Sequence, residues 1–456
     1  MKKWICSLSL CVAALQSQAQ VKPFQQNDRV IFVGNSITEA GAYVSYIYLY
    51  YMTHFPGQRL VIMNGGIGGD KASDIYRRLD YDILAKKPNV MVLTFGMNDT
   101  GYFEFNEDNA AERAKQRIAA SEASYKLVEQ RLLQMPALRK ILMSSPPYDE
   151  TAKIGGAVFR GKQAALAEVV KFQEAAARKN GWDFADLYRP MTALNVKLQQ
   201  QDSTFTLIGG DRIHPGNAGH LVMAAEFLKS QGLAGKPVAV VAIDAKKKSS
   251  RTENCSVQGL QATPTNIRLQ YLAQSLPYPI DTVARIWGNP QRQADALQWI
   301  PFTEDFNREI LRVAGLEKGN YALKIDGRQL GVWPAAEWEQ GINLALLETP
   351  QRNQAMSVMQ LNLRRAEVEA RLRRYFWVQG NYFDKKKMRQ QDDAAALDSV
   401  RLAAKTDGML RYHEENYETA MYKELRALWE QEIATITDLI YKVNKPVAHQ
   451  LEIVKI

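Results

Sequence analysis

Cysteine and histidine are scarce in this chain of 456 residues, which contains three Cys and five His. Cys6 and Cys11 both fall in an N-terminal apolar stretch, so Cys255 stands alone in the rest of the chain. One thiol cannot form an intramolecular disulfide, and a lone Cys is more often a small buried apolar residue than a reactive group. The Cys and His positions also lack metal-ligand spacing. The sequence therefore predicts neither a disulfide nor a metal or other cofactor.

Long hydrophobic runs are also rare. One apolar stretch, residues 4–15, follows Lys2 and Lys3 and precedes a few small residues. It is too short to anchor a protein in a bilayer, so it indicates a signal peptide over residues 1–19, cleaved near Ala19. We expect an exported protein, periplasmic or extracellular.

Lipoprotein processing at Cys11 is the alternative to this cleavage. It is disfavoured because Leu10 occupies the position before the cysteine, where a small residue is needed. The chain has no second long apolar run, so we expect no membrane span.

Strong local charge is lacking as well. The formal net charge is +9, but the basic excess is spread along the chain. The runs Lys246–Lys248 and Lys385–Lys387 lie in polar stretches, where solvated loops are the more frequent outcome. Nucleic acid is therefore not an expected partner, and a mildly basic surface is compatible with acidic polysaccharides.

Apolar strands alternate with amphipathic helices up to about residue 236. Such alternation predicts an α/β fold, with a parallel sheet covered by helices on both faces. The expected strands are 29–33, 60–63, 90–95, 140–144 and 182–185, and the expected helices are 39–55, 72–84, 110–134, 162–180 and 218–231.

The pattern changes after Pro237. Residues 237–348 form a predicted β-rich accessory region, with alternating strands at 267–272, 310–313 and 321–327. Residues 349–456 form a predicted helical C-terminal region, because apolar residues recur there at spacings of three and four. The expected helices are 354–379, 394–405 and 413–443.

Four short motifs occupy the loops of the α/β region. Three follow predicted strands and one precedes the last helix, so the fold gathers them at the carboxyl edge of the sheet, where ligands bind in open parallel sheets. The motifs are GNSIT at 34–38, NGGIGGD at 64–70, GMND at 96–99 and DRIH at 211–214.

This ordered set resembles the SGNH (GDSL-type) hydrolase superfamily over roughly residues 27–236. The resemblance implies a hydrolase domain over 20–236 with a flavodoxin-like three-layer α/β/α fold. It also implies ester hydrolysis through an acyl intermediate on Ser36.

Ser36, His214 and Asp211 are the expected catalytic residues. A serine needs an adjacent base to act as a nucleophile, and His214 would take its proton. Asp211 would orient the imidazole, as in a Ser-His-Asp triad. The alternatives are a helix N-cap for Ser36 and a loop cap for Asp211. His220, inside the last helix of the region, is expected to be a packed residue and not a second base.

The resemblance also implies the donors that stabilise the oxyanion. They are the backbone N–H groups of Ser36 and Gly69 and the side-chain amide of Asn98. A glycine permits close backbone approach, and an amide donates without carrying charge.

Four further motif residues are expected to brace the site. Asn64 and Asp70 would hold the glycine loop, and Asp99 would hold Asn98 and its turn. Asn35 departs from the family pattern, which has Asp at this position; an amide accepts the same hydrogen bonds without a charge.

The expected substrate is an ester, with a carbohydrate O-acetyl ester on an acetylated glycan as the leading candidate. A lysophospholipase or general short-chain esterase is the alternative, and a glycan-binding or scaffold protein with a vestigial hydrolase domain is an alternative of another class. Four accessory tryptophans either stack on sugars or pack the second core, the more frequent outcome: Trp287, Trp299, Trp333 and Trp338.

Overall fold

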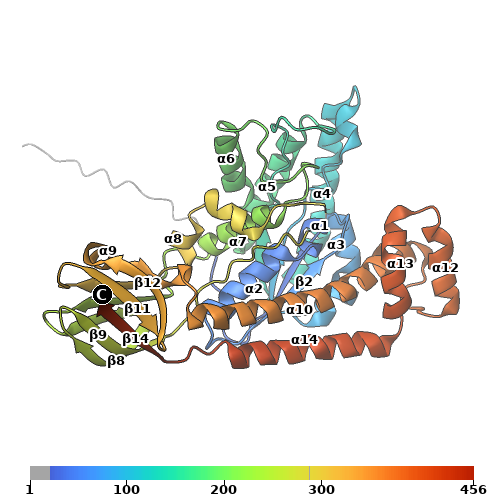
Figure 1. Cartoon of the computed structure of the whole chain (residues 1–456). Coiled ribbons are helices and arrows are strands. Elements are labelled where there is room, and N and C mark those ends of the chain that lie inside the picture. The colour runs from blue at the N-terminus through green and yellow to red at the C-terminus, as the bar shows by residue number, and fades with distance from the viewer. Residues whose placement is uncertain (1–20, 287) are drawn as a thin grey trace, which may run out of the picture.

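The computed structural model describes residues 21–286 and 288–456. The predicted signal peptide with Cys11, and also Trp287, lie outside the described residues. Three parts are visible in Figure 1: a central α/β unit, a β-rich unit on the left, and a helical unit that crosses below the centre and extends to the right.

The central sheet has five parallel strands in the order β2-β1-β3-β4-β5. Consecutive side chains on a strand point to opposite faces, and both faces are buried here. Val30 and Phe32 thus join one core, while Ile31 and Val33 join the other. The strands are β1 (Arg29–Gly34), β2 (Val61–Gly66), β3 (Val90–Leu93), β4 (Arg139–Met143) and β5 (Asp183–Ala185).

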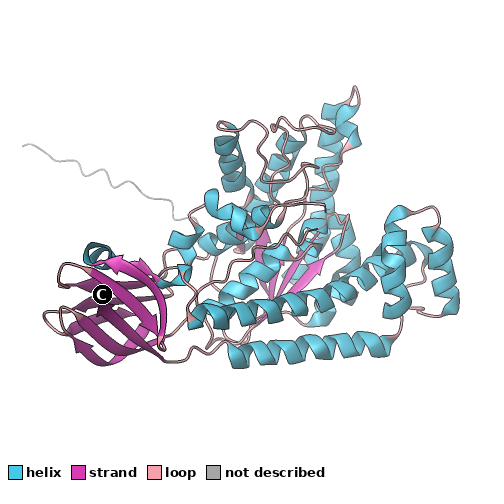
Figure 2. Ribbon diagram, in the orientation of Figure 1, coloured by secondary structure: helices cyan, strands magenta, loops and turns pink. Residues whose placement is uncertain are grey.

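Helices cover both faces of this sheet, so the expected three-layer α/β fold is confirmed (Figure 2). The helices are α1 (Ser36–Glu39), α2 (Ala42–His54), α3 (Ala72–Arg78), α4 (Ala110–Leu133), α5 (Lys162–Asn180), α6 (Tyr188–Gln199) and α7 (Asn217–Ser230), with short turns η1 (Leu79–Ile83), η2 (Leu84–Lys86) and η3 (Phe103–Asn106).

Two helices of this unit differ from the sequence prediction. The expected helix 39–55 starts only at Ala42, as α2, because Gly41 adopts φ +78, a left-handed conformation that separates it from the short α1. Helix α6 was not predicted, since Pro190 lies in its first turn, where proline is tolerated although it breaks helices elsewhere.

The β-rich unit contains a four-stranded sheet, ordered β13-β10-β6-β7, and a five-stranded sheet, ordered β12-β11-β14-β9-β8. Its strands are β6 (Ala239–Asp244), β7 (Ser249–Glu253), β8 (Cys255–Ala262), β9 (Asn266–Ala273), β10 (Glu309–Ala314), β11 (Asn320–Ile325), β12 (Arg328–Pro334), β13 (Ile342–Asn343) and β14 (His449–Lys455). Its short helices are α9 (Ala335–Gln340) and η5 (Leu344–Leu346). The short helices η4 (Gln293–Gln298) and α8 (Phe302–Phe306) come from the same part of the chain but pack in the core of the central unit.

Strand β14 corrects the expected helical region 349–456, because its last residues belong to the β-rich unit. It is inserted between β11 and β9 and pairs antiparallel with both. Leu451 and Ile453 are buried at alternate positions, the period of a strand and not of a helix.

The helical unit consists of α10 (Pro350–Val378), η6 (Gln379–Phe383), α11 (Asp384–Lys386), α12 (Ala394–Ala404), α13 (Gly408–Ala420) and α14 (Lys423–Val443). The expected single helix 413–443 is wrong, because Tyr422 is extended (ψ 114) and separates α13 from α14. Over the described residues, none of the helices combines the length and apolar character needed to cross a membrane.

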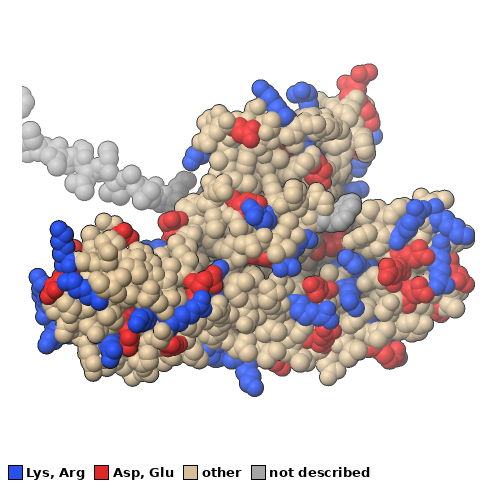
Figure 3. All heavy atoms as spheres, in the orientation of Figure 1, with Lys and Arg blue, Asp and Glu red and all other residues tan. Residues whose placement is uncertain are grey.

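Helix α10 connects the helical unit to the central one. Its first half contributes Ala355, Val358 and Met359 to the core around α2 and α7. Its second half contributes Val368 and Leu372 to a separate helical core, which also contains Ile67 from the loop after β2. The helical unit is therefore packed directly against the carboxyl edge of the sheet. On the face shown in Figure 3, Lys and Arg are interspersed with Asp and Glu.

Candidate active site

Ser36 stands where β1 passes into α1, at the carboxyl edge of the sheet. The N-cap of α1 is Asn35, whose side chain accepts a hydrogen bond from the Ile37 N–H at 3.0 Å. Asn35, and not Ser36, thus has the helix-capping role that was the alternative for Ser36. The Asn35 side chain accepts the same hydrogen bond that an aspartate would accept at this position. The Ser36 hydroxyl is left to face His214.

His214 and Asp211 lie in the loop before α7. The Ser36 Oγ is 2.8 Å from His214 Nε2, and His214 Nδ1 is 2.5 Å from Asp211 Oδ2. Asp211 Oδ1 also accepts the backbone N–H groups of Ile213 and His214, so the carboxylate caps its own loop while it holds the imidazole. The side chains of His214 and Asp211 are 45% and 51% exposed, so the triad lies open to solvent.

Asp211 is held in the ionised form that a triad carboxylate needs. Partial burial works to raise the pKa of Asp211, but hydrogen bonds from the His214 side chain and from two backbone N–H groups outweigh it and hold the pKa below its usual range. An ionised carboxylate fixes the imidazole tautomer that leaves Nε2 free to accept a proton.

The expected oxyanion donors lie on adjacent loops. Gly69 is exposed and adopts φ +86, and among the described residues the backbone N–H groups of Ser36 and Gly69 have no hydrogen-bond acceptor. Asn98 Nδ2 donates to the Asp70 carbonyl oxygen at 3.0 Å, which joins its turn to the glycine loop. Backbone N–H groups without an acceptor are suited to stabilise a developing negative charge.

Asn64 connects the two loops that carry Ser36 and Gly69. Its side-chain amide donates to the Thr38 and Glu39 carbonyl oxygens at 2.8 and 3.2 Å, and its Oδ1 accepts the Gly66 N–H at 2.8 Å. Gly66 itself leaves no room for a side chain, since a Cβ would lie 2.2 Å from the Glu39 nitrogen. This close approach explains the glycine at that position.

Asp99 makes three hydrogen bonds below the Asn98 turn. Its carboxylate accepts from the Ala72 N–H at 2.9 Å, the Ser121 hydroxyl at 2.8 Å and the Gly96 N–H at 2.9 Å. It therefore connects the loop after β3 to α3 and α4.

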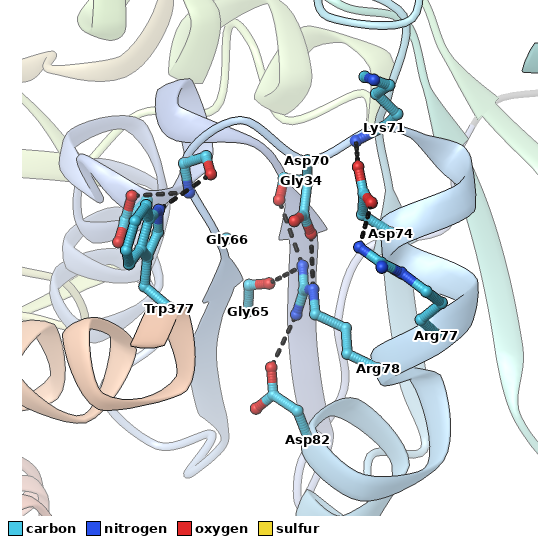
Figure 4. A network of polar contacts seen from close by, with 12 residues as sticks. Gly34, Gly65, Gly66, Asp70, Lys71, Asp74, Arg77, Arg78, Asp82 and Trp377 are labelled. Atoms are coloured by element: carbon cyan, nitrogen blue, oxygen red, sulfur yellow. Dashed lines mark hydrogen bonds and ion pairs between the residues drawn. The ribbon is translucent and has the colours of Figure 1, made fainter. Parts of the chain in front are cut away.

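Asp70 is buried in an ionic network with residues that the sequence analysis did not identify. Arg78 donates to Asp70 at 2.6 Å and to Asp82 at 2.7 Å, and its guanidinium also reaches the carbonyl oxygens of Gly34 and Gly65 (Figure 4). Arg373 from α10 binds Asp82 with two nitrogens, at 2.9 and 2.6 Å. The network ties the ends of β1 and β2 to the helical unit.

Two more residues near Asn98 were missed. Tyr102 donates its hydroxyl to Asn98 Oδ1 at 2.6 Å. The buried Lys162 ammonium donates to the Met97 and Gly101 carbonyl oxygens and to the Thr100 hydroxyl, at 2.6, 2.5 and 2.8 Å. Neither residue belongs to a motif, and only the position of Tyr102 shortly after GMND was a signal.

The remaining histidines have structural surroundings. His220 is buried and stacks on Tyr43, and its Nδ1 accepts a hydrogen bond from the Tyr43 backbone N–H at 3.3 Å. Burial lowers the pKa of His220 to about 3. His54 stacks on Tyr50 with ring centroids 4.0 Å apart. The packed role expected for His220 agrees with this environment.

The described accessory tryptophans favour the packing alternative. Trp338 is fully buried and meets Trp333 edge to face at 5.7 Å. Trp299 meets Phe205 of the central unit in the same geometry at 5.0 Å. Cys255 is buried and free.

Comparison with known proteins agrees with this architecture. The GDSL-like Lipase/Acylhydrolase family matches residues 32–222, and the diltiazem deacetylase C-terminal helical domain matches residues 356–445. The solved structure of a gut microbial diltiazem-metabolizing enzyme is 44% identical, with a TM-score of 0.93, over 96% of this chain and 99% of that one.

More distant similarity covers the central unit. An acetylxylan esterase from Geobacillus stearothermophilus is 24% identical over 220 residues, which are 45% of this chain and 94% of the esterase. A crystal structure of an acetylxylan esterase from that organism has 22% identity and a TM-score of 0.37, over 46% of this chain and 95% of that one.

The three-layer fold and the serine site define a hydrolase of the GDSL type. The chain belongs to the GDSL/SGNH hydrolase family, in its diltiazem deacetylase-like form with a C-terminal helical domain, and it is an acylhydrolase.

Proposed function

We propose that this chain is an exported serine esterase that removes acetyl groups from O-acetyl esters, with acetylated carbohydrate as its natural substrate. The observation that carries the proposal is the chain of contacts from Ser36 Oγ to His214 at 2.8 Å and from His214 to Asp211 at 2.5 Å. Such a chain activates a serine hydroxyl for acyl transfer.

The reaction proceeds in two halves. Ser36 Oγ attacks the ester carbonyl carbon while His214 Nε2 takes the hydroxyl proton, and the tetrahedral intermediate collapses as the protonated His214 returns that proton to the leaving alcohol. Water then attacks acyl-Ser36 with His214 again as base, which releases acetate and restores the serine. In both halves the N–H groups of Ser36 and Gly69 and the Asn98 amide receive the oxyanion.

The exposure of the triad supports a bulky alcohol. Because about half of the His214 and Asp211 side-chain surface is open to solvent, the leaving group is not confined to an enclosed pocket. Similarity to an acetylxylan esterase and to the diltiazem deacetylase C-terminal helical domain favours acetyl as the acyl group. An open site of this kind has room for a sugar unit that carries the acetyl group and is still part of a polysaccharide.

One exposed aromatic side chain, next in sequence to Tyr102, is suited to contact the alcohol part of the ester. Phe103 is 76% exposed and meets Phe159 edge to face at 5.6 Å, and the neighbouring Tyr102 binds Asn98. Exposed aromatic faces stack on sugar rings. We expect Phe103→Ala to raise KM for acetylated xylan with little change in kcat on a small acetate ester.

The test uses the protein purified without residues 1–19, assayed on p-nitrophenyl acetate, p-nitrophenyl palmitate, acetylated xylan and diltiazem. Ser36→Ala should abolish release, and Asp211→Asn should lower kcat by about 10⁴-fold if the triad behaves as in serine proteases. Ser124→Ala, on the outer helix α4, is the matched control and should keep full activity.

Each substrate decides a different part of the proposal. Preference for palmitate over acetate would contradict a deacetylase and indicate a lipase-type activity. Release of acetate from diltiazem but not from acetylated xylan would indicate that the substrate is a small aromatic ester and not a carbohydrate. Full activity in Ser36→Ala would remove the nucleophile, and no release from any ester would favour the binding-protein alternative.

Export is tested separately. The full chain, expressed in a Gram-negative host, should appear in the periplasm or medium with an N-terminus near Gln20. Retention of residues 1–19 on a cytoplasmic protein would contradict it.

A further inference from the structure

Gly68 of the glycine loop is held from two sides, through the peptide group before it and the peptide group after it. The Gly68 carbonyl oxygen accepts a hydrogen bond from the indole Nε1 of Trp377 at 3.1 Å, and the Gly68 N–H donates to Glu39 Oε2 at 2.8 Å (Figure 4). Trp377 belongs to α10 of the helical unit, whereas Glu39 ends α1 behind the serine. The two contacts enclose Gly68 closely, since a Cβ there would lie 2.8 Å from Glu39 Oε2 and 3.5 Å from Trp377 Nε1.

The Trp377 contact determines the orientation of the next N–H group. The Gly68 carbonyl and the Gly69 N–H belong to the same peptide group, and in a planar trans peptide they point in opposite directions. A donor fixed on the carbonyl therefore directs the Gly69 N–H to the other side. That N–H is one of the donors assigned to the oxyanion.

Glycine on both sides makes this restraint necessary. Gly68 and Gly69 lack the Cβ atoms that restrict the backbone of other residues, so the peptide between them can rotate at little steric cost. Gly69 already adopts φ +86, and a Cβ on it would meet nothing within 4 Å. The Trp377 bond supplies the restraint that side-chain sterics do not. Hydrogen bonds in series also polarise one another, which strengthens the Gly69 N–H as a donor.

Trp377 is itself rigidly held. Its side chain is 7% exposed and stacks on His413 of α13, with ring centroids 4.2 Å apart and planes at 19°. One turn earlier on α10, Arg373 donates to the Gly66 carbonyl oxygen at 3.3 Å and binds Asp82. The helical unit thus contacts the glycine loop at two carbonyl oxygens, those of Gly66 and Gly68.

We propose that Trp377 is a positioning residue of the active site, which sets the direction of the Gly69 N–H toward the oxyanion. The helical unit is then part of the acyl-transfer machinery and not a detachable module. This inference rests on the proposed function, because it requires Gly69 to be an oxyanion donor.

The decisive variant is Trp377→Phe, which keeps an aromatic ring against His413 and removes the N–H donor. We expect kcat on p-nitrophenyl acetate to fall about three- to tenfold, the equivalent of one neutral hydrogen bond, with KM changed by less than about twofold because the interaction acts in the transition state. The inhibition constant of phenylboronic acid, whose tetrahedral adduct on Ser36 is anionic and presents an oxygen to the oxyanion donors, should rise by the same factor.

Trp429→Phe is the matched control. Trp429 is 6% exposed and lies in the same helical core, but it contacts Arg371 by a cation–π interaction and not the glycine loop. It should keep wild-type kcat and boronate affinity. If Trp377→Phe does not fold, β-(3-benzothienyl)alanine at position 377 keeps the ring shape without the N–H and serves in its place.

Unchanged kcat and boronate affinity in a folded Trp377 variant would overturn the inference, as would an equal loss in Trp429→Phe. These results differ from failure of the proposed function, which appears as an active Ser36→Ala protein or an inactive wild type.

Discussion

The Tyr102 hydroxyl donates to Asn98 Oδ1 at 2.6 Å, and the Asn98 amide donates in turn to the Asp70 carbonyl oxygen at 3.0 Å. The tyrosine therefore decides which end of the Asn98 side chain points away from the loop. With the oxygen occupied by Tyr102, the NH₂ group is the end left to face Asp70 and the site.

Tyr102→Phe should accordingly lower kcat. The ring stays in its aromatic contact with Phe159, but Asn98 loses the bond that fixes its orientation, and we expect a fall of about tenfold in kcat, less than the 10²–10³ typical of losing an oxyanion donor outright. Steady-state kinetics on p-nitrophenyl acetate check this. Tyr125→Phe is the matched control, since the buried Tyr125 hydroxyl has no partner within the described residues. Equal kinetics in the two variants would contradict the role of Tyr102.

Lys162→Met should destabilise the turn that carries Asn98. Removal of the ammonium leaves the buried Met97 and Gly101 carbonyl oxygens without a donor, at a cost of about 1–3 kcal/mol for each unsatisfied group. We expect a lower Tm and a reduced kcat together, measured by thermal unfolding and ester release. Lys171→Met, on the exposed face of the same helix, should change neither. A Tm equal to the wild-type value would show that the turn does not depend on Lys162.

Deletion of residues 449–456 should destabilise the β-rich unit, although it removes only the chain end. Strand β14 lies between β9 and β11, so its loss exposes two strand edges. It also removes Leu451 and Ile453, each worth about 1.5–3 kcal/mol by burial. Poor solubility or a lowered Tm is the expected outcome. Deletion of Ile456 alone, which is 70% exposed, should be tolerated. A soluble protein with unchanged Tm after the longer deletion would contradict this role of β14.

Glu309→Gln should stabilise the protein at neutral and alkaline pH. Burial raises the pKa of Glu309 from 4.5 to about 7, opposed only by the Tyr271 hydroxyl, which donates to it at 2.8 Å. A carboxyl whose pKa is raised on folding favours the folded state below its unfolded pKa, and that advantage is lost as the pH rises through the folded value.

The gain in unfolding free energy of the glutamine variant over the wild type should therefore grow between pH 4.5 and about pH 7 and stay constant above it. At 1.36 kcal/mol per pKa unit, it reaches about 3 kcal/mol. Unfolding at pH 5 and pH 8 measures the difference. Glu253→Gln, on the exposed edge strand β7, is the control and should show little pH dependence. A pH-independent difference for Glu309→Gln would refute the pKa argument.

Local patterns were sufficient to predict the central sheet. The strands at 29–33, 90–95 and 140–144 are short apolar runs bounded by turn residues, and each lies within one or two residues of the observed strand. The pattern failed where the helical spacing of apolar residues continues from one helix into the next. At Tyr422 an extended residue separates α13 from α14, and no glycine or proline marks the break.

The chemistry of the site was likewise contained in short motifs. Ser36, Asp211 and His214 follow strand ends or precede a helix, so the topology of a parallel sheet was enough to predict that they meet, and they lie at hydrogen-bond distance. Their catalytic roles stay predictions until the variants are measured.

The sequence by itself thus determined the fold of the central unit and the residues offered for acyl transfer, because both depend on local periodicity and on motifs at strand ends. Only the tertiary structure decided that Trp377 and Arg373 hold the glycine loop, and that β14 completes a sheet begun almost two hundred residues earlier. Those contacts join positions 309, 307 and 178 or more residues apart. Periodicity shows which face of a helix or strand is buried, but not the partner against which it is buried.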